Sequence, residues 1–198
     1  MQSLLFSLLS VAALIAAATT WVIISTLHLG IPPMPSSRKV RRAVLEALCD
    51  LPPGTRVVDL GAGWGGLMAR IARERPDLAV EGYERSPVPH LVARIRCAAI
   101  RLRRRGGGHW RRIRRARPGP RPQVNFGDFR KVGPRDGACY ITYLSPEGMR
   151  WIRELFERHL PRDVLLVSAV FAVRGWTPAR SIAVPDMHRS RVYIYELK

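Results

Sequence analysis

The chain has 198 residues, of which 33 are Lys or Arg and 15 are Asp or Glu, so the formal net charge is +18. Such an excess predicts a polyanionic neighbour, for which nucleic acid and anionic membrane surfaces are the usual candidates. The three cysteines and five histidines show no metal-ligand or disulfide spacing, so the sequence predicts neither a metal site nor a disulfide framework.

The first thirty residues differ in composition from the rest. Residues 4–29 contain no Lys, Arg, Asp or Glu. At about 1.5 Å per residue, a helix over them is long enough to cross a hydrocarbon core of about 30 Å, so we expect a transmembrane anchor within residues 1–30. The alternative is a signal peptide cleaved near residues 16–18. However, no basic segment precedes the apolar run, and the run continues past Trp21.

Basic residues follow this run and none precedes it. Because basic flanks stay on the cytoplasmic side, we expect a single-pass protein with its N-terminus outside and its main domain in the cytoplasm. Residues 31–37, IPPMPSS, hold three prolines, which favour an extended linker. The main domain is then expected over residues 38–198, enough for one domain with a core.

Helical and strand patterns alternate through this domain. Helices are predicted over 37–49, 67–75, 87–104 and 146–160, and strands over 55–60, 78–83, 124–126, 137–144 and 164–173. Two last strands, 180–184 and 191–197, are expected to form an antiparallel pair. The alternation predicts an α/β fold, in which a parallel sheet carries helices on both faces.

Residues 101–122 form a basic insertion that does not fit this alternation. They hold ten of the 33 basic residues together with a run of three glycines. Like charges at this density repel one another, so we expect an exposed loop. Its arginines could lie on anionic lipid head groups.

The stretch VVDLGAGWGG, residues 57–66, is the most informative motif. Its glycines match the dinucleotide pattern G-x-G-x-x-G, in which backbone N–H groups at a helix start meet a pyrophosphate. A carboxylate at Asp59 is unfavourable beside a pyrophosphate. It suits a cationic ligand such as S-adenosylmethionine, which carries an ammonium and a sulfonium group and no phosphate.

Two more acidic residues follow strands of the predicted sheet. Glu84, after the second strand, could accept from ribose hydroxyls, and Asp128, after the third, could accept from the adenine amino group. Ligands of open parallel sheets bind outside the carboxyl ends of the strands, where both would meet Asp59. Each of these three acidic residues has a structural alternative. Asp59 could hold the glycine turn, Glu84 could pair with Arg85 or another surface arginine, and Asp128 could be a turn residue.

These motifs resemble those of the class I, seven-β-strand, S-adenosylmethionine-dependent methyltransferases. VVDLGAGWGG resembles their first motif, YERSP their second acidic strand end and NFGDF their third. The resemblance implies a Rossmann-like sheet and S-adenosyl-L-methionine as cofactor. It implies cofactor contacts from Asp59, Gly61, Ala62, Gly63, Gly65, Glu84, Asp128 and Phe129.

Shorter motifs resemble one branch of that superfamily, the membrane-anchored protein-lysine methyltransferases that act on the adenine nucleotide translocase and the ATP synthase c subunit. PPMPSS resembles the proline-rich stretch that follows their single N-terminal span, GWTP at 175–178 the W-T-P after their fifth strand, and YLSPEGM the Leu-Pro-Glu segment of prokaryotic relatives. Trp64 stands where these proteins mostly have Asp, and the insertion at 101–122 is longer than theirs. Both departures leave the substrate open.

The implied reaction is an in-line displacement, in which a substrate nitrogen attacks the methyl carbon. Proximity and alignment supply most of the acceleration, and the protein must accept the amine in its neutral form. The candidate walls of an amine channel are Tyr143, Ser145, Pro146, Glu147 and Trp176. The alternatives are a helix-start role for Glu147 and packing roles for Tyr143 and Trp176.

The leading hypothesis is therefore a methyltransferase that acts on lysines of proteins near the membrane. Alternatively, the same chemistry acts on RNA or a small amine, with the arginines and Trp110 contacting phosphates and bases. The lack of a recognised RNA-binding module argues against nucleic acid. A non-catalytic membrane adaptor with the same fold is a third hypothesis. An NAD-dependent reductase is disfavoured by Asp59 and by the lack of a Tyr-x-x-x-Lys pair.

Overall fold

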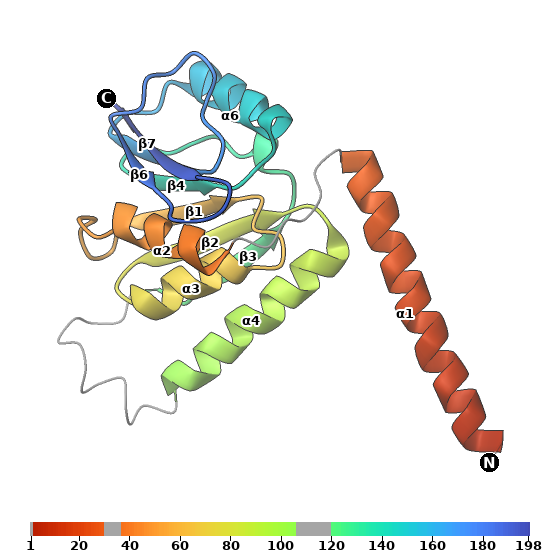
Figure 1. Ribbon diagram of the computed structural model, residues 1–198. Coiled ribbons are helices and arrows are strands. Elements are labelled where there is room, and N and C mark those ends of the chain that lie inside the picture. The colour runs from red at the N-terminus through yellow and green to blue at the C-terminus, as the bar shows by residue number, and fades with distance from the viewer. Residues whose placement is uncertain (1, 30–36, 106–119) are drawn as a thin grey trace. The chain divides into compact units, whose positions relative to one another are not determined.

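A computed structural model describes residues 2–29, 37–105 and 120–198 (Figure 1). The predictions made for most of the proline-rich linker and of the basic insertion lie outside these residues. The chain divides into two compact units, Met1–Met34 and Pro35–Lys198, and each is considered by itself.

The first unit contains one helix, α1 (Gln2–Leu29). Its described side chains are exposed, including large apolar ones such as Phe6, Leu14 and Ile15, each more than 60% exposed. The side chains of residues 2–4, 18 and 21–29 lie outside the description. Among the residues that are described, no helix combines the length and the apolar character needed to span a bilayer.

The second unit is built around one seven-stranded sheet with the strand order β3-β2-β1-β4-β5-β7-β6. The first five strands in this order pair in parallel, whereas β7 is antiparallel to both β5 and β6. The elements, in chain order, are α2 (Arg38–Ala47), β1 (Arg56–Leu60), α3 (Gly66–Glu74), β2 (Ala79–Glu84), α4 (Pro87–Arg105), β3 (Gln123–Phe126), η1 (Phe129–Lys131), β4 (Cys139–Thr142), α6 (Pro146–His159), β5 (Val164–Ala169), β6 (Arg180–Ala183) and β7 (Arg191–Leu197).

Helices cover both faces of the sheet, as the alternating pattern predicted. Figure 1 shows α2, α3 and α4 on one face and α6 on the other. Alternate residues of β4 pack against the two different helix layers, because side chains along a strand point to opposite faces of the sheet. Cys139 and Ile141 belong to the main core with α2 and α3, whereas the Tyr140 ring meets that of Phe156 of α6 at a centroid distance of 5.2 Å.

The predicted elements of the second unit are confirmed to within two residues at each end, except the strand predicted over 164–173. The strand predicted over 164–173 ends at Ala169. Val170 has a φ of +74°, and the hydroxyl of Ser168 donates to the carbonyl of Phe171, so the chain turns out of the sheet there. The strand predicted over 137–144 ends at Thr142, before the cap of α6.

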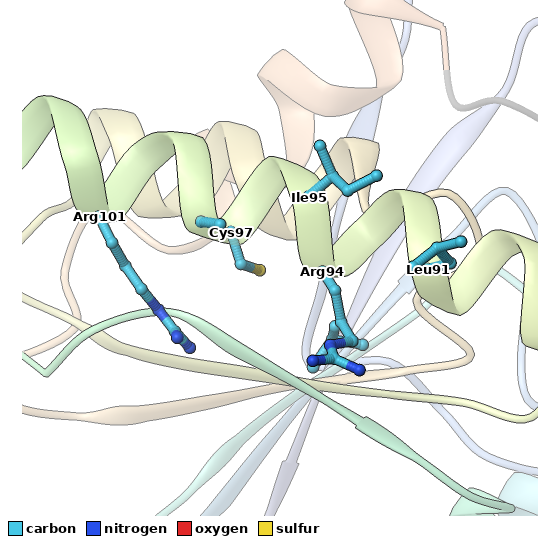
Figure 2. A pocket seen from close by; sticks show the side chains of 7 residues that line it. Leu91, Arg94, Ile95, Cys97 and Arg101 are labelled. Atoms are coloured by element: carbon cyan, nitrogen blue, oxygen red, sulfur yellow. The ribbon is translucent and has the colours of Figure 1, made fainter.

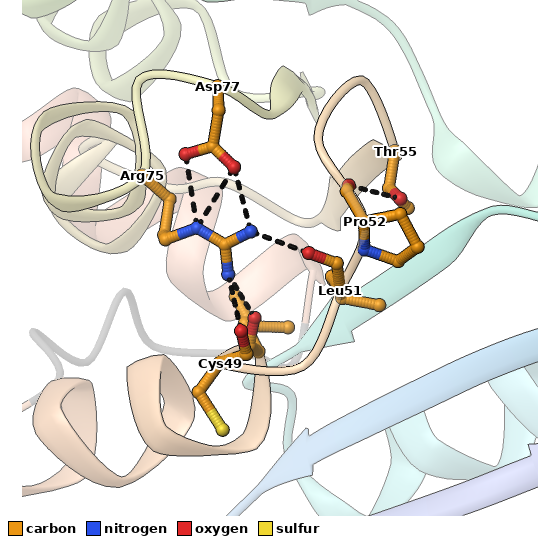
Figure 3. A network of polar contacts seen from close by, with 7 residues as sticks. Cys49, Leu51, Pro52, Thr55, Arg75 and Asp77 are labelled. Carbon is orange, nitrogen blue, oxygen red and sulfur yellow. Dashed lines mark hydrogen bonds and ion pairs between the residues drawn. The ribbon is translucent and has the colours of Figure 1, made fainter. Parts of the chain in front are cut away.

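A polar network joins the end of α2 to the end of α3 (Figure 3). Arg75 is largely buried and donates to the carbonyls of Leu48, Cys49 and Leu51, which follow the last turn of α2. Its guanidinium also pairs with Asp77 at 2.8 Å. The network satisfies carbonyls at a helix C-terminus and fixes the segment that leads into β1.

Candidate active site

The glycine loop connects β1 to α3 at the carboxyl edge of the sheet and is pinned against the end of β2. The backbone N–H groups of Gly61 and Ala62 both donate to the carbonyl of Tyr83, at 3.1 and 2.8 Å. Gly61, Gly63 and Gly65 have φ values of +84°, +53° and +71°. Glycine adopts this left-handed region without the steric cost of a Cβ, which explains why the motif carries it at alternate positions.

The surroundings of the three glycines differ. A Cβ on Gly61 would lie 2.9 Å from Cδ2 of Leu144, and one on Gly65 would lie 2.7 Å from Cβ of Ala93 in α4. A Cβ on Gly63 would have no described atom within 4 Å. The loop is therefore packed tightly at its two ends and open at its middle glycine.

Glu84, the last residue of β2, contacts the middle of the glycine loop. One carboxylate oxygen accepts from the N–H of Gly63 at 2.7 Å, and the other accepts from the N–H of Ser86, also at 2.7 Å. The end of β2 thus holds the middle of the glycine loop. Arg85, the ion-pair partner considered for Glu84, pairs with Asp128 instead, at 3.6 Å.

Asp59 lies beneath the loop and is only 3% exposed. Burial, and then the negative charge of Glu84, raise the pKa of this carboxyl to about 7, although a hydrogen bond from the backbone of Met68 opposes both. Its Oδ2 is buried without a hydrogen-bond partner among the described residues. A buried carboxylate oxygen without a partner is costly, and a cationic or hydrogen-bonding ligand would offset that cost.

Asp128 is at the end of β3, as predicted, but its carboxylate is already paired. It accepts from Nε of Arg130 at 2.9 Å, and it caps η1 through the N–H of the same residue. Burial raises the pKa of Asp128, but the hydrogen bonds and charges of Arg130 and Arg85 outweigh it, so the pKa lies below its ordinary value. The proposed contact with an adenine amino group stays a prediction. The neighbouring Phe129 is buried.

The segment after β4 brings three of the predicted residues to the loop side of the sheet. Leu144 lies against Gly61, between Tyr143 and the cap residue Ser145, whose hydroxyl accepts from Gly148 at 3.3 Å. Pro146 is the first residue of α6. Tyr143 is half-buried, and its pKa is raised by burial and then by the charge of Asp186 in the β6–β7 turn.

Two predicted wall residues have contacts typical of structural roles. Glu147 is exposed, lies in the first turn of α6 and pairs with Arg150. The Trp176 ring meets those of Phe156 and Tyr195 at 6.4 and 5.8 Å, and its Nε1 donates to Glu157. These contacts lie along α6 and β7, and the role of Trp176 in an amine channel stays a prediction.

His90 was not singled out from the sequence, yet it borders this edge of the sheet. It is 9% exposed, and its Nδ1 is buried without a hydrogen-bond partner in the described part of the chain. Its ring meets that of Phe126 edge-on at 5.3 Å. Burial and then Arg94 lower its pKa, while Glu84 raises it. The sequence did offer one indication that His90 lies near the site: it belongs to the first turn of the helix that follows Glu84.

Metal-ligating side chains do not gather at this site. Within the described residues, no group of three or more His, Cys, Asp or Glu side chains is arranged to hold a metal ion. Cys97 and Cys139 are buried, whereas Cys49 is exposed.

Solved structures share this fold. An RNA methyltransferase from Salinibacter ruber, in complex with S-adenosyl-L-homocysteine, is 22% identical, with a TM-score of 0.64 over 83% of this chain and 94% of that one. An rRNA methyltransferase from Streptomyces viridochromogenes is 12% identical, with a TM-score of 0.55 over 84% and 87% of the two chains. The second unit thus has the class I S-adenosylmethionine-dependent methyltransferase fold, as its motifs predicted.

Sequence comparison adds one curated protein from Escherichia coli, a cyclopropane-fatty-acyl-phospholipid synthase. It is 30% identical over an alignment of 122 residues that covers 55% of this chain and 29% of the relative. The match thus spans less than a third of the relative's length. No protein-family profile matches the chain.

Proposed function

We propose that this chain is an S-adenosyl-L-methionine-dependent methyltransferase and that its substrate is a lysine of a protein close to a membrane. The observation that carries the first part is the buried, unpartnered oxygen of Asp59 beside an open glycine loop. The bound S-adenosyl-L-homocysteine in the structure from Salinibacter ruber supports the same cofactor.

The residues around the loop fit this cofactor. Asp59 and Glu84 place two carboxylates at the ends of adjacent parallel strands, where a positively charged ligand is favoured and a pyrophosphate is not. When bound, S-adenosyl-L-methionine supplies a methyl group activated by its attachment to a positively charged sulfur. Glu84 and the loop backbone would bind and orient it, and Asp59 would complement its positive charge.

The chain's own residues would then position the substrate. With an activated methyl group, the protein need not provide a nucleophile, and alignment of the amine can supply roughly 7 to 11 kcal/mol of the acceleration. Tyr143 precedes Leu144, which lies against Gly61, and the charge of Asp186 acts on Tyr143. Asp186 would attract an ammonium group, and the half-buried Tyr143 would help to desolvate it, which lowers the pKa of a lysine from about 10.4.

A membrane-proximal substrate follows from the apolar N-terminal segment. The exposed apolar side chains of α1 need a partner, because water is an unfavourable surrounding for so many of them. We infer that residues 4–29 hold the chain against a membrane through their apolar side chains, without the need to span it, and that the methyltransferase unit lies on the cytoplasmic side. An anchor raises the local concentration of membrane-proximal lysines without any new contact.

RNA is the second candidate substrate. The net charge of +18 and the two structurally similar RNA methyltransferases favour it. The acidic cofactor site is common to both candidates, so it does not distinguish them. What does distinguish them is the molecule that receives the methyl group.

One labelling experiment separates these candidates. The purified full-length protein is incubated with methyl-labelled cofactor, native membranes and total RNA, and the products are divided by protease, ribonuclease and organic extraction. We expect protease-sensitive label that mass spectrometry maps to lysine. Label lost only on ribonuclease treatment would favour RNA, and label extracted into organic solvent would favour a lipid substrate.

Cofactor binding is measured in parallel by calorimetry. We expect the protein to bind S-adenosyl-L-homocysteine and not NADH. Tight binding of NADH alone would overturn the cofactor assignment. Binding of S-adenosyl-L-homocysteine without transfer of label to any fraction would support the non-catalytic adaptor.

A further inference from the structure

Helix α4 carries two apolar stripes, whereas a surface helix normally has one. Ala93, Cys97 and Ile100 form the buried stripe, which belongs to the packed side of the helix. The second stripe is exposed and consists of Leu91, Ile95, Ala98, Ala99 and Leu102. Its large members, Leu91, Ile95 and Leu102, are 55%, 61% and 65% exposed.

The exposed stripe is narrow and lies between arginines. At about 100° per residue, its five members fall within a sector of roughly 100° of the helix. Arg94 and Arg101 lie on one flank of that sector, and Arg96 and Arg103 lie on the other. The helix contains no acidic residue that could neutralise them.

A hollow of about 310 Å³ adjoins one flank of the stripe, between α4 and the edge strand β3. Its lining includes the apolar side chains of Leu91, Ile95 and Val124. The arginines Arg94 and Arg101 also line it. Figure 2 shows these two arginines extending from α4 on the same side of the helix. The surface thus combines an apolar hollow with two guanidinium groups at its edge.

We propose that this face of α4 docks onto an anionic membrane surface, with the stripe at the boundary between head groups and acyl chains. Aliphatic side chains flanked by arginines are the pattern of helices that lie in a membrane interface, because the long basic side chains reach the head-group phosphates while the apolar stripe is buried. RNA would also attract the arginines, but single-stranded RNA is bound through stacking on aromatic side chains, and this stripe is entirely aliphatic. Docking here goes beyond methyl transfer and does not depend on it.

Lipid photocrosslinking in the full-length protein tests this contact. Ile95 is replaced by the photoreactive residue benzoylphenylalanine, and the protein is reconstituted into phosphatidylcholine vesicles with or without phosphatidylglycerol. Leu160, at the end of α6, is the control position, because it is apolar and 76% exposed. We expect Ile95 to label lipid several-fold more than Leu160 does, and only in vesicles that contain phosphatidylglycerol.

Charge reversal tests the role of the arginines. Arg96 and Arg101 also donate to the backbone carbonyls of Trp64 and Pro122, so Arg94 and Arg103 are the better choice. R94E/R103E should reduce labelling at Ile95 several-fold, whereas a double reversal at the exposed Arg158 and Arg174, with the same change in net charge, should not.

Three results would overturn the proposal: equal labelling at Ile95 and Leu160, labelling at Ile95 without phosphatidylglycerol, or transfer of the label to RNA when RNA is added. Binding of S-adenosyl-L-homocysteine is measured in the same preparations. Normal cofactor binding without lipid labelling would remove the docking surface and leave the proposed methyltransferase standing.

Discussion

Glu84 accepts a hydrogen bond with each carboxylate oxygen, which ties the end of β2 to the glycine loop. Glutamine offers only one acceptor oxygen, so one of the two N–H groups would face an NH₂ group. A hydrogen bond to a charged group contributes about 1.5–3 kcal/mol. We therefore expect Glu84→Gln to weaken S-adenosyl-L-homocysteine binding about 10- to 100-fold in calorimetry.

Glu81 provides the matched control, because it lies on the same strand and pairs with the half-exposed Arg56. Glu81→Gln should change cofactor affinity less than threefold and stability by at most about 1 kcal/mol. Equal losses in both variants would show that Glu84 acts only through general stability.

Asp59 is expected to make the ligand-free protein less stable as pH rises, the opposite of what a carboxyl group with a lowered pKa does. Its pKa is raised to about 7, so the folded state keeps a proton that the unfolded state releases. Its contribution to stability is fully present below the unfolded pKa, about 3.9, and is lost as pH rises towards 7. We expect the unfolding free energy of the wild type, relative to Asp59→Asn, to fall by up to about 1.4 kcal/mol per pH unit across this window.

Urea unfolding from pH 4 to pH 8 measures this difference. Asparagine keeps the shape of the side chain and cannot ionise, so its curve lacks this contribution. Parallel pH profiles for the two proteins would mean that Asp59 is already ionised in the folded protein, with a partner for its Oδ2.

Two glycines of the loop are expected to be needed for different reasons: Gly65 for packing and Gly63 for ligand binding. A Cβ on Gly65 would meet Ala93 at 2.7 Å, whereas one on Gly63 would enter open space. Gly65→Ala should therefore cost about 2–4 kcal/mol of stability, from backbone strain and overpacking against α4. Gly63→Ala should cost about 1 kcal/mol of stability and reduce S-adenosyl-L-homocysteine affinity at least tenfold, because its methyl group would occupy ligand space. Urea unfolding and calorimetry separate these effects, and the reverse pattern would place the ligand elsewhere.

The packing of Trp176 against helix α6 offers a test of the predicted amine channel. Trp176 packs against Phe156 of α6 and Tyr195 of β7. From these contacts we expect Trp176→Leu to lower stability by about 2–4 kcal/mol and to leave the KM for the amine unchanged. The channel-wall role predicted from the sequence requires the opposite, a raised KM with little loss of stability. Steady-state kinetics together with unfolding of the variant decides between them.

The same elements show what could be predicted from the sequence. The order of strands and helices follows from local hydrophobic patterns, and parallel pairing then brings Asp59 and Glu84 to one edge. The role of Asp128 as a cap of η1 agrees with the turn role considered from the sequence, whereas the packing of Trp176 depends on which distant side chains meet it. Local patterns carry no information about such contacts. His90 was missed for the same reason, because its burial depends on Phe126 of another strand.

The whole chain combines an acidic cofactor site with a strongly basic surround. In the proposed function Asp59 and Glu84 favour a cationic ligand at one edge, while the net charge of +18 favours anionic partners elsewhere. A membrane with anionic head groups would be such an anionic partner if the unit is tethered there. Its lysine substrates would then be supplied by membrane proteins rather than by free peptides.

Tethering can be tested by removing the first unit, Met1–Met34, and keeping Pro35–Lys198. The shortened chain contains the whole sheet and the glycine loop, so its affinity for S-adenosyl-L-homocysteine should stay within about twofold. Its labelling of native membranes should fall by about 10²-fold or more, because an intramolecular encounter becomes a bimolecular one. Labelling of a lysine peptide free in solution should not change. An unrelated apolar helix in place of residues 4–29 should restore membrane labelling, since the tether needs only to hold the unit near its substrate. Equal membrane labelling by the shortened chain would mean that recognition, and not tethering, selects the substrate.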